Sequence, residues 1–178
     1  MFQKSTYAQN AMQVLAETCT QKELAIDSHV TPALISNQIK GKRTVSLEQA
    51  EQLIDSYNEP RSTYLFAHKF SNGMIPPLLD GLDSHHASLT NRFELEVEEA
   101  INTLKSSSEA MTYTLIKGDM SQREAAKQAI AEITDVIATA LTLNISIAKA
   151  FNIELQQILE KRDKFYQKRG LIQSQNKQ

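Results

Sequence analysis

Glycine and proline are scarce in this sequence, and long stretches of helix-favouring residues lie between them. The 178 residues contain five glycines and four prolines. The intervening stretches are rich in Ala, Leu, Glu, Gln and Lys, which have high helix propensity. Few segments show the alternation of apolar and polar residues that is typical of a strand. We therefore predict an all-α chain.

The bulk composition is that of an ordinary soluble globular protein, with 41% apolar and 22% charged residues. No apolar run approaches the roughly 20 residues that span a membrane, and the N-terminus lacks the basic and apolar segments of a signal peptide. We predict a cytoplasmic protein with no membrane partner. The single cysteine, Cys19, excludes a disulfide within the chain, and we interpret it as a small buried side chain.

Helix caps and apolar spacing divide the N-terminal third into short helices. Apolar residues at spacings of three and four predict a first helix over residues 7–19. Thr20 and Glu23 have the spacing of a capping box, in which each side chain bonds the other residue's backbone N–H. They predict a second helix over residues 21–27.

Three more helix starts follow in the same region. Thr31 is a predicted cap, with Pro32 at the first helical position, where its missing N–H costs nothing. Ser46 and Gln49 have the spacing of another capping box, in its amide form. A fifth helix is predicted to begin near Pro60.

A change in composition divides the chain into two parts. The segment FSNGMIPPLLDG, which ends at Gly81, contains two glycines and two prolines, the residues that most often interrupt helices. We therefore predict a domain over residues 1–72, a linker over residues 73–82 and a helical bundle over residues 83–178.

The second part is predicted to consist of long helices. Residues 89–105 and 121–168 have helical patterns, separated by a break at Gly118–Asp119 with Ser121 as the next cap. The longer stretch divides near Phe151–Asn152 into two helices.

Residues 20–43, TQKELAIDSHVTPALISNQIKGKR, have the pattern of two helices joined by a tight turn. Their shared core is predicted from Leu24, Ala25, Val30 and Ile35. The order QKELA, VTPALIS and GKR, followed by SLEQAEQLIDSY, resembles the lambda-repressor-like XRE/Cro family over about residues 7–70. This resemblance implies a five-helix, helix-turn-helix DNA-binding domain in a transcriptional regulator of the phage-repressor type, more commonly a repressor.

The resemblance also implies which residues contact double-stranded DNA. Gln21, at the start of the second helix, would hold a phosphate and support the third helix. The groove-facing positions of the third helix are Thr31, Pro32, Ala33, Ser36 and Asn37. Asn37 can bond adenine through two hydrogen bonds, whereas Pro32 and Ala33 suit a thymine methyl. The phosphate backbone would be contacted by Lys40, Lys42, Arg43 and Thr44.

Two features qualify this interpretation. His29 occupies the turn position at which the family usually has Gly, so we expect a histidine in the left-handed conformation. Residues 1–72 contain seven lysines and arginines and seven aspartates and glutamates, so the domain is neutral overall. Affinity for phosphate must therefore come from the local basic loop.

The second part carries pairs of acids at helical spacing, Glu96 with Glu99 and Glu132 with Asp135. Together with RFELEVEEAINTL and AIAEITDVIATALTL, they resemble in part the MazG-type all-α nucleoside triphosphate pyrophosphatases. This resemblance implies Mg²⁺ bound by ExxE and ExxD motifs. Leu95 stands where the family has a second acid, and the acids also fit a solvated helix face. The alternative function is thus a metal-dependent pyrophosphatase fused to a DNA-binding module.

The apolar stretch from Ile130 to Ile147 favours a plainer role for the second part. A helix that is apolar over much of its circumference needs a partner. Because regulators of this type bind pseudo-palindromic operators in pairs, we predict a homodimerisation domain, no enzyme activity and no cofactor. A domain that senses a small molecule or a protein effector remains an alternative. His85 and His86, which are adjacent and expected to face apart, are interpreted as linker residues rather than metal ligands.

Overall fold

The computed structural model describes the backbone of residues 6–114 and 120–172, and the side chains of residues 6–108 and 123–172. The described residues form helices and no strand, which confirms the prediction of an all-α chain. The helices are α1 (Thr6–Leu15), α2 (Gln21–Asp27), α3 (Pro32–Ile39), α4 (Leu47–Tyr57), α5 (Pro60–Phe70), α6 (His86–Thr114), α7 (Met120–Ala150) and α8 (Leu155–Lys168).

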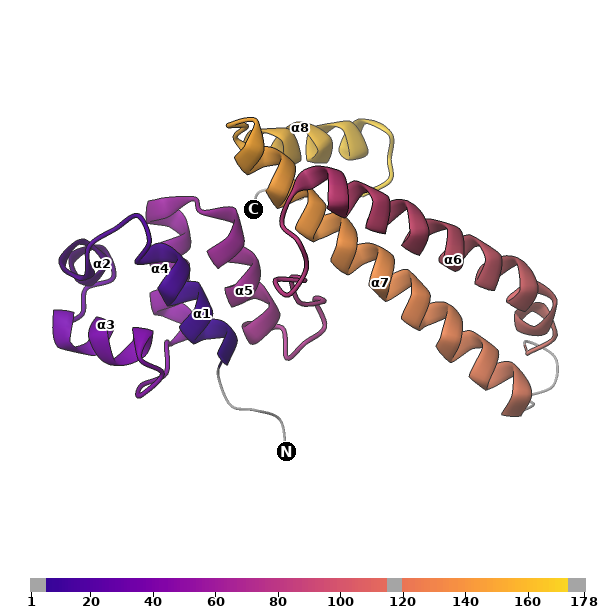
Figure 1. Ribbon diagram of the computed structural model, residues 1–178, viewed down its shortest axis with the longest axis horizontal. Helices are drawn as coiled ribbons and strands as arrows, with labels where there is room; N and C mark the ends of the chain where they lie inside the picture. Colours follow the sequence, from indigo (N-terminus) through magenta and orange to yellow (C-terminus); the bar gives the residue numbers. More distant parts are fainter. Residues whose placement is uncertain (1–5, 115–119, 173–178) are drawn as a thin grey trace.

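The helices pack in two groups. Helices α1 to α5 form a compact cluster, in which α1 packs on α5 and α3, and α2 packs on α3 and α4. Helices α6 and α7 lie side by side as an antiparallel hairpin that extends away from this cluster, and α8 crosses one end of it (Figure 1). Each group has a separate set of helix contacts.

The core of the first group lies where its five helices meet. Its largest fully buried side chains are Met12, Leu15, Leu24, Ile35, Leu53 and Phe66. Of the four residues predicted to lock the helix-turn-helix, Leu24, Ala25 and Ile35 are buried. Val30 lies half-buried at the edge of the same core, and Cys19 is also only partly buried there.

Two of the predicted helix caps are confirmed. The Glu23 N–H donates to Thr20 Oγ1 over 3.2 Å and the Thr20 N–H donates to Glu23 Oε2 over 2.8 Å, which is a complete capping box. The Thr20 N–H and the Thr20 hydroxyl both donate to the Glu23 carboxylate, and these two bonds hold the pKa of Glu23 below its ordinary value. Thr31 Oγ1 accepts from the Leu34 N–H over 3.3 Å.

The capping box predicted at Ser46 is only half present. Ser46 Oγ accepts from the Gln49 N–H, but the Gln49 side chain does not return to the cap. It turns inward, where it is buried with a 5% exposed fraction. The sequence prediction was wrong here because a buried amide partner competes better for this side chain than a solvated backbone N–H.

That partner is Gln38, on the inner face of α3 and only 1% exposed. The Gln38 amide donates to Gln49 Oε1 over 2.7 Å, and the Gln49 amide donates back to Gln38 Oε1 over 3.0 Å. Gln38 Nε2 also donates to the Thr44 carbonyl, and Gln49 Nε2 lies 3.5 Å from Ser28 Oγ. This amide pair therefore joins α3, α4, the loop after α3 and the end of α2.

The hairpin of α6 and α7 has an inner seam of small residues. Its buried side chains are mostly small: Ala100, Ser107, Ala129, Ala138, Thr139 and Ala148. Large apolar side chains point outward instead, among them Ile130, which is 65% exposed. The hairpin therefore leaves much of its apolar surface uncovered.

The helix boundaries in this part differ in detail from the prediction. The break predicted at Gly118–Asp119 lies outside the described residues, as does the side chain of Ser121, whose backbone already lies inside α7. The predicted division at Phe151–Asn152 is confirmed, and Asn152 has a left-handed φ of 51°.

One stretch of α7 has the length and composition of a membrane span. In the described part of the chain, Arg123–Ala150 reaches a mean hydropathy of 1.5 over 18 residues. The sequence pattern did not predict such a segment. A helix covered by a second soluble subunit has the same composition, so this property alone does not define the partner of α7.

The segment between the two groups is attached to both of them. Leu78 packs against the core of α1 to α5. The Leu79 N–H donates to Thr142 Oγ1 on α7 over 3.0 Å, and Ser146 Oγ on α7 donates to the Ser84 carbonyl over 2.7 Å. The predicted linker is thus packed against structure on both sides.

We expect Gln38→Leu and Gln49→Leu each to lower the free energy of unfolding by about 1–3 kcal/mol, because each leaves a buried amide without its partner. The double variant should lose clearly less than the sum. Urea unfolding of the two variants, the double variant and Gln128→Leu, which changes an exposed glutamine on α7, measures these differences. Additive losses would show that the two amides do not act as a pair.

Candidate nucleic-acid interface

Helix α3 presents the start of its outer face to solvent. Thr31, Pro32 and Ala33 are exposed, and Ser36 and Asn37 are partly exposed on the same side of the helix. Ile35 and Gln38 occupy the opposite, buried face. The five residues predicted to face a DNA groove therefore lie together on an accessible surface.

The turn before α3 holds this face at the edge of the molecule. His29 has a φ of 52°, so the predicted left-handed histidine is confirmed. The Val30 N–H donates to the Ala25 carbonyl over 2.9 Å, which closes the end of α2. Gln21 is exposed at the first position of α2. A short, closed turn of this kind leaves α3 little freedom to tilt against α2.

The loop after α3 is held through its backbone and leaves its cations exposed. Gly41 has a φ of 70° and ends α3. The N–H groups of Lys42 and Arg43 both donate to the Asn37 carbonyl, over 2.8 and 3.3 Å. Gln9 and Gln13 of α1 donate to the Ile39 carbonyl over 3.3 Å each. The backbone of the loop is therefore held in place by helices on two sides.

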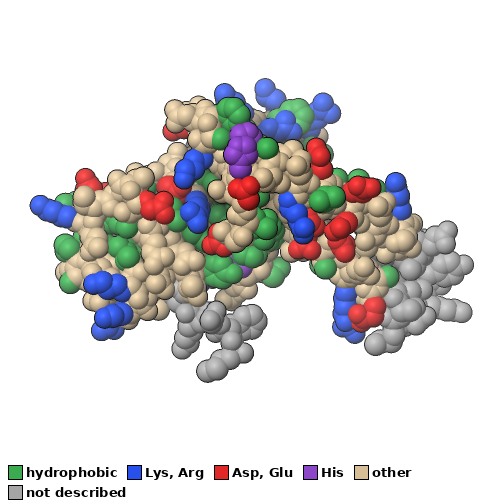
Figure 2. Space-filling view, in the orientation of Figure 1, with side chains coloured by type: hydrophobic (Ala, Val, Ile, Leu, Met, Phe, Trp, Pro, Cys, Tyr) green, Lys and Arg blue, Asp and Glu red, His purple; other side chains and the backbone are tan. Residues whose placement is uncertain are grey.

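The side chains of this loop form a small basic surface. Lys40, Lys42, Arg43 and Thr44 are all exposed. The ion pairs formed by described side chains are Arg92–Glu96 and Lys127–Glu124, so the three cations have no acidic partner there. Figure 2 shows lysine and arginine side chains gathered at the end of the molecule that α3 forms. An anion could approach them without displacing a carboxylate.

The residues that position this surface were not predicted from the sequence. Gln38 donates to the Thr44 carbonyl and Gln9 donates to the Ile39 carbonyl, so both side chains hold the backbone of the loop. The available indication was the spacing of Gln38, three residues after the buried Ile35 and hence on the same inner face of α3. A polar residue at such a position needs a buried partner.

Three of the four acids predicted as an alternative metal site come together in the hairpin. The carboxylate oxygens of Glu96, Glu99 and Glu132 lie within 4.8 Å of one another. Asp135 is exposed and stands outside this group. Glu96 is buried but already paired with the Arg92 guanidinium. The group could contribute oxygen ligands to a hard cation, but the Arg92 guanidinium would place a positive charge beside that cation.

The two adjacent histidines do not face apart as expected. Their rings stack with centroids 4.5 Å apart, because α6 begins only at His86 and His85 lies before it. Asp83 accepts from Ser88 Oγ over 2.6 Å and from the His85 N–H over 3.1 Å. These two hydrogen bonds hold the pKa of Asp83 below its ordinary value. Asp83 therefore organises the start of α6.

Comparison of the chain with protein-family models, curated proteins and solved structures gave no match.

The geometry of Gly41 generates a prediction about the basic loop. We expect Gly41→Ala to lower the free energy of unfolding by about 1–2 kcal/mol, because a left-handed alanine is strained and its Cβ would lie 2.5 Å from Gln9 Oε1. Gly81→Ala is the matched control, since its Cβ would meet nothing within 4 Å. Thermal and urea unfolding compare the two variants. Equal stability of both would contradict the constraint placed on the loop.

Proposed function

We propose that this chain is a sequence-specific DNA-binding transcriptional regulator that binds its operator as a homodimer. One observation carries the proposal. The exposed face of α3 is followed by a loop whose cations have no acidic partner among the described side chains, and buried contacts hold both the helix and the loop. A rigid helix end beside a basic loop suits insertion into the major groove, with phosphates held at its side.

The residues of this surface would have two different roles, contact with bases and contact with phosphates. Asn37 would read a base through its amide, and Pro32 and Ala33 would contact a thymine methyl. Lys42 and Arg43, with Gln21 on the other side of the turn, would bind the phosphates and supply affinity that does not depend on sequence. Repression is the regulatory outcome we propose, because a protein seated on an operator excludes other proteins from that DNA.

We expect Asn37→Ala to lower the discrimination between bases at one operator position by about 1–3 kcal/mol. Lys42→Ala should weaken binding to all sequences and reduce the slope of log affinity against log salt concentration by about one. Lys105→Ala, which removes the same charge from exposed α6, is the control. Fluorescence anisotropy with the preferred operator and point variants, at several salt concentrations, separates these effects. Equal losses on every sequence for both interface variants would refute the assigned roles.

The neutral first domain makes pairing necessary to this function. One copy offers few base contacts and one small basic loop, whereas two linked copies raise the effective concentration of the second contact. The exposed stripe on α7 supports the pairing. Ile130, Ile133 and Ile137 have exposed fractions of 65%, 39% and 43% and stand three and four residues apart, which is the spacing of a helix-pairing seam.

A second copy of the chain is the occupant we propose for this stripe. The buried side chains of the hairpin are mostly small, so its own core buries less apolar surface than a seam of large side chains would. Two hairpins packed through their stripes would form a four-helix bundle, in which each buried isoleucine contributes about 1.5–3 kcal/mol. A two-fold axis through the bundle would also present two α3 helices to one face of a DNA duplex.

We expect Ile133→Asp to convert the dimer into a monomer, because it places an unpaired carboxylate in an apolar interface. Gln128→Asp, on the opposite side of α7, should leave the dimer intact. Sedimentation equilibrium should give twice the 20.0 kDa of the chain for the unmodified protein and the control. A monomer in solution that co-sediments with phosphatidylcholine vesicles would point to a membrane as the partner of α7 and contradict the pairing.

The metal-dependent pyrophosphatase remains the second candidate. The convergence of Glu96, Glu99 and Glu132 favours it. The ion pair between Arg92 and Glu96 and the outlying position of Asp135 count against it. A hard cation needs several oxygens free of other charges, so we propose a structural role for these acids.

A further inference from the structure

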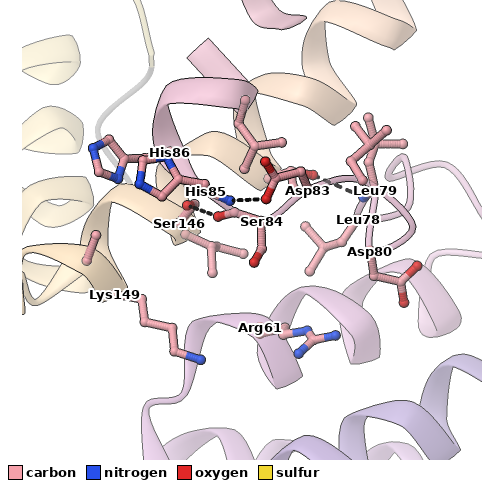
Figure 3. A pocket seen from close by; sticks show the side chains of 15 residues that line it. Arg61, Leu78, Leu79, Asp80, Asp83, Ser84, His85, His86, Ser146 and Lys149 are labelled. Carbon is pink, nitrogen blue, oxygen red and sulfur yellow. Dashed lines mark hydrogen bonds between the residues drawn. The ribbon is translucent and has the colours of Figure 1, made fainter. Parts of the chain in front are cut away.

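A pocket lies where the two groups of helices approach each other. It has a volume of about 710 Å³, within the range of roughly 300–1,000 Å³ that small-molecule sites occupy. One side is the start of α5, another is the segment before α6, and a third is the end of α7 (Figure 3). Neither group of helices forms it alone.

The hydrogen bonds of the connecting segment keep this pocket in place. Thr142 and Ser146 stand one helical turn apart on α7 and bond the backbone of Leu79 and Ser84, respectively. All four residues line the pocket. The segment therefore forms one wall of the pocket, and these hydrogen bonds hold its backbone against α7.

The lining combines an apolar interior with two cations. Its apolar side chains are Leu78, Leu79, Leu82, Leu89 and Ile145. Arg61 reaches the pocket from α5 and Lys149 reaches it from α7, so one cation comes from each group of helices (Figure 3). Neither forms an ion pair with a described side chain.

The acids of the pocket do not neutralise these cations. Asp83 is already occupied by Ser88 Oγ and the His85 N–H. Asp80 is exposed, and it lies within ion-pair distance of neither Arg61 nor Lys149. An apolar space with one cation from each group of helices, neither of them paired with a described acid, favours a ligand with an apolar body and a negative charge.

We propose that this pocket binds a small organic anion, a carboxylate with an apolar chain or ring, whose charged end is held by Arg61 and Lys149. The apolar body lies against the leucines of the connecting segment and Ile145. Because the ligand contacts α5 of one group and α7 of the other, it favours one orientation of the two groups. A regulatory role for this ligand rests on the proposed function, because the orientation of the two groups would set the spacing of two α3 helices on DNA.

Octanoate is the probe for this site, and octan-1-ol is the uncharged control with the same chain. Isothermal titration calorimetry of the full chain should show octanoate binding at one site per chain, with octan-1-ol at least tenfold weaker. Arg61→Gln and Lys149→Gln should each weaken octanoate by roughly tenfold, the effect of losing a hydrogen bond to a charged group. Lys105→Gln, with the same loss of charge on α6, should bind octanoate normally.

The outcomes separate the pocket from the proposed function. Lys149 is exposed, so we expect its variant to fold normally. Unchanged circular dichroism and an unchanged unfolding midpoint would verify this. No octanoate binding, equal binding of octan-1-ol, or equal losses in Lys105→Gln would overturn the proposal. Octanoate binding that depends on Arg61 and Lys149 supports the site even in a chain that binds no DNA. A severalfold change in operator affinity at saturating octanoate, absent in Lys149→Gln, supports the effector role, and an unchanged affinity overturns that role.

Discussion

The exchange of hydrogen bonds between Gln38 and Gln49 fixes the outer face of α3. Both amides are buried, so each has little freedom to find another partner. Through Ser28 and the Thr44 carbonyl, the same pair reaches the end of α2 and the basic loop. The surface that we propose for DNA is thus held from behind by polar contacts, while Leu24 and Ile35 supply the apolar packing.

The second group of helices has the opposite character. The buried side chains of its hairpin are mostly small, and Ile130, Ile133 and Ile137 of α7 are exposed. Such a hairpin would be covered as half of a larger bundle, and the DNA-binding function that we propose for the neutral first group would also require pairing. The connecting segment, which packs on both groups, would transmit a change of orientation between the paired bundle and the two α3 helices.

Local chemistry made much of the fold predictable. The caps at Thr20 and Thr31, the start at Pro60 and the left-handed His29 each depend on neighbours in the sequence. The amide pair was not predictable in this way, because its members are 11 residues apart and meet only in the packed core. The contacts of the connecting segment with α7 span 62 and 63 residues, and the pocket beside them exists only in the folded chain.

The central claim is that two copies of the chain place two α3 helices on one face of DNA. Selection of fragments bound by the full-length protein from a random DNA library tests it most directly, because it needs no knowledge of the operator. Our account predicts enrichment of inverted half-sites with centres about 10 base pairs, or a multiple of that distance, apart. A library that shows no enrichment over the input, or only isolated half-sites, would contradict it.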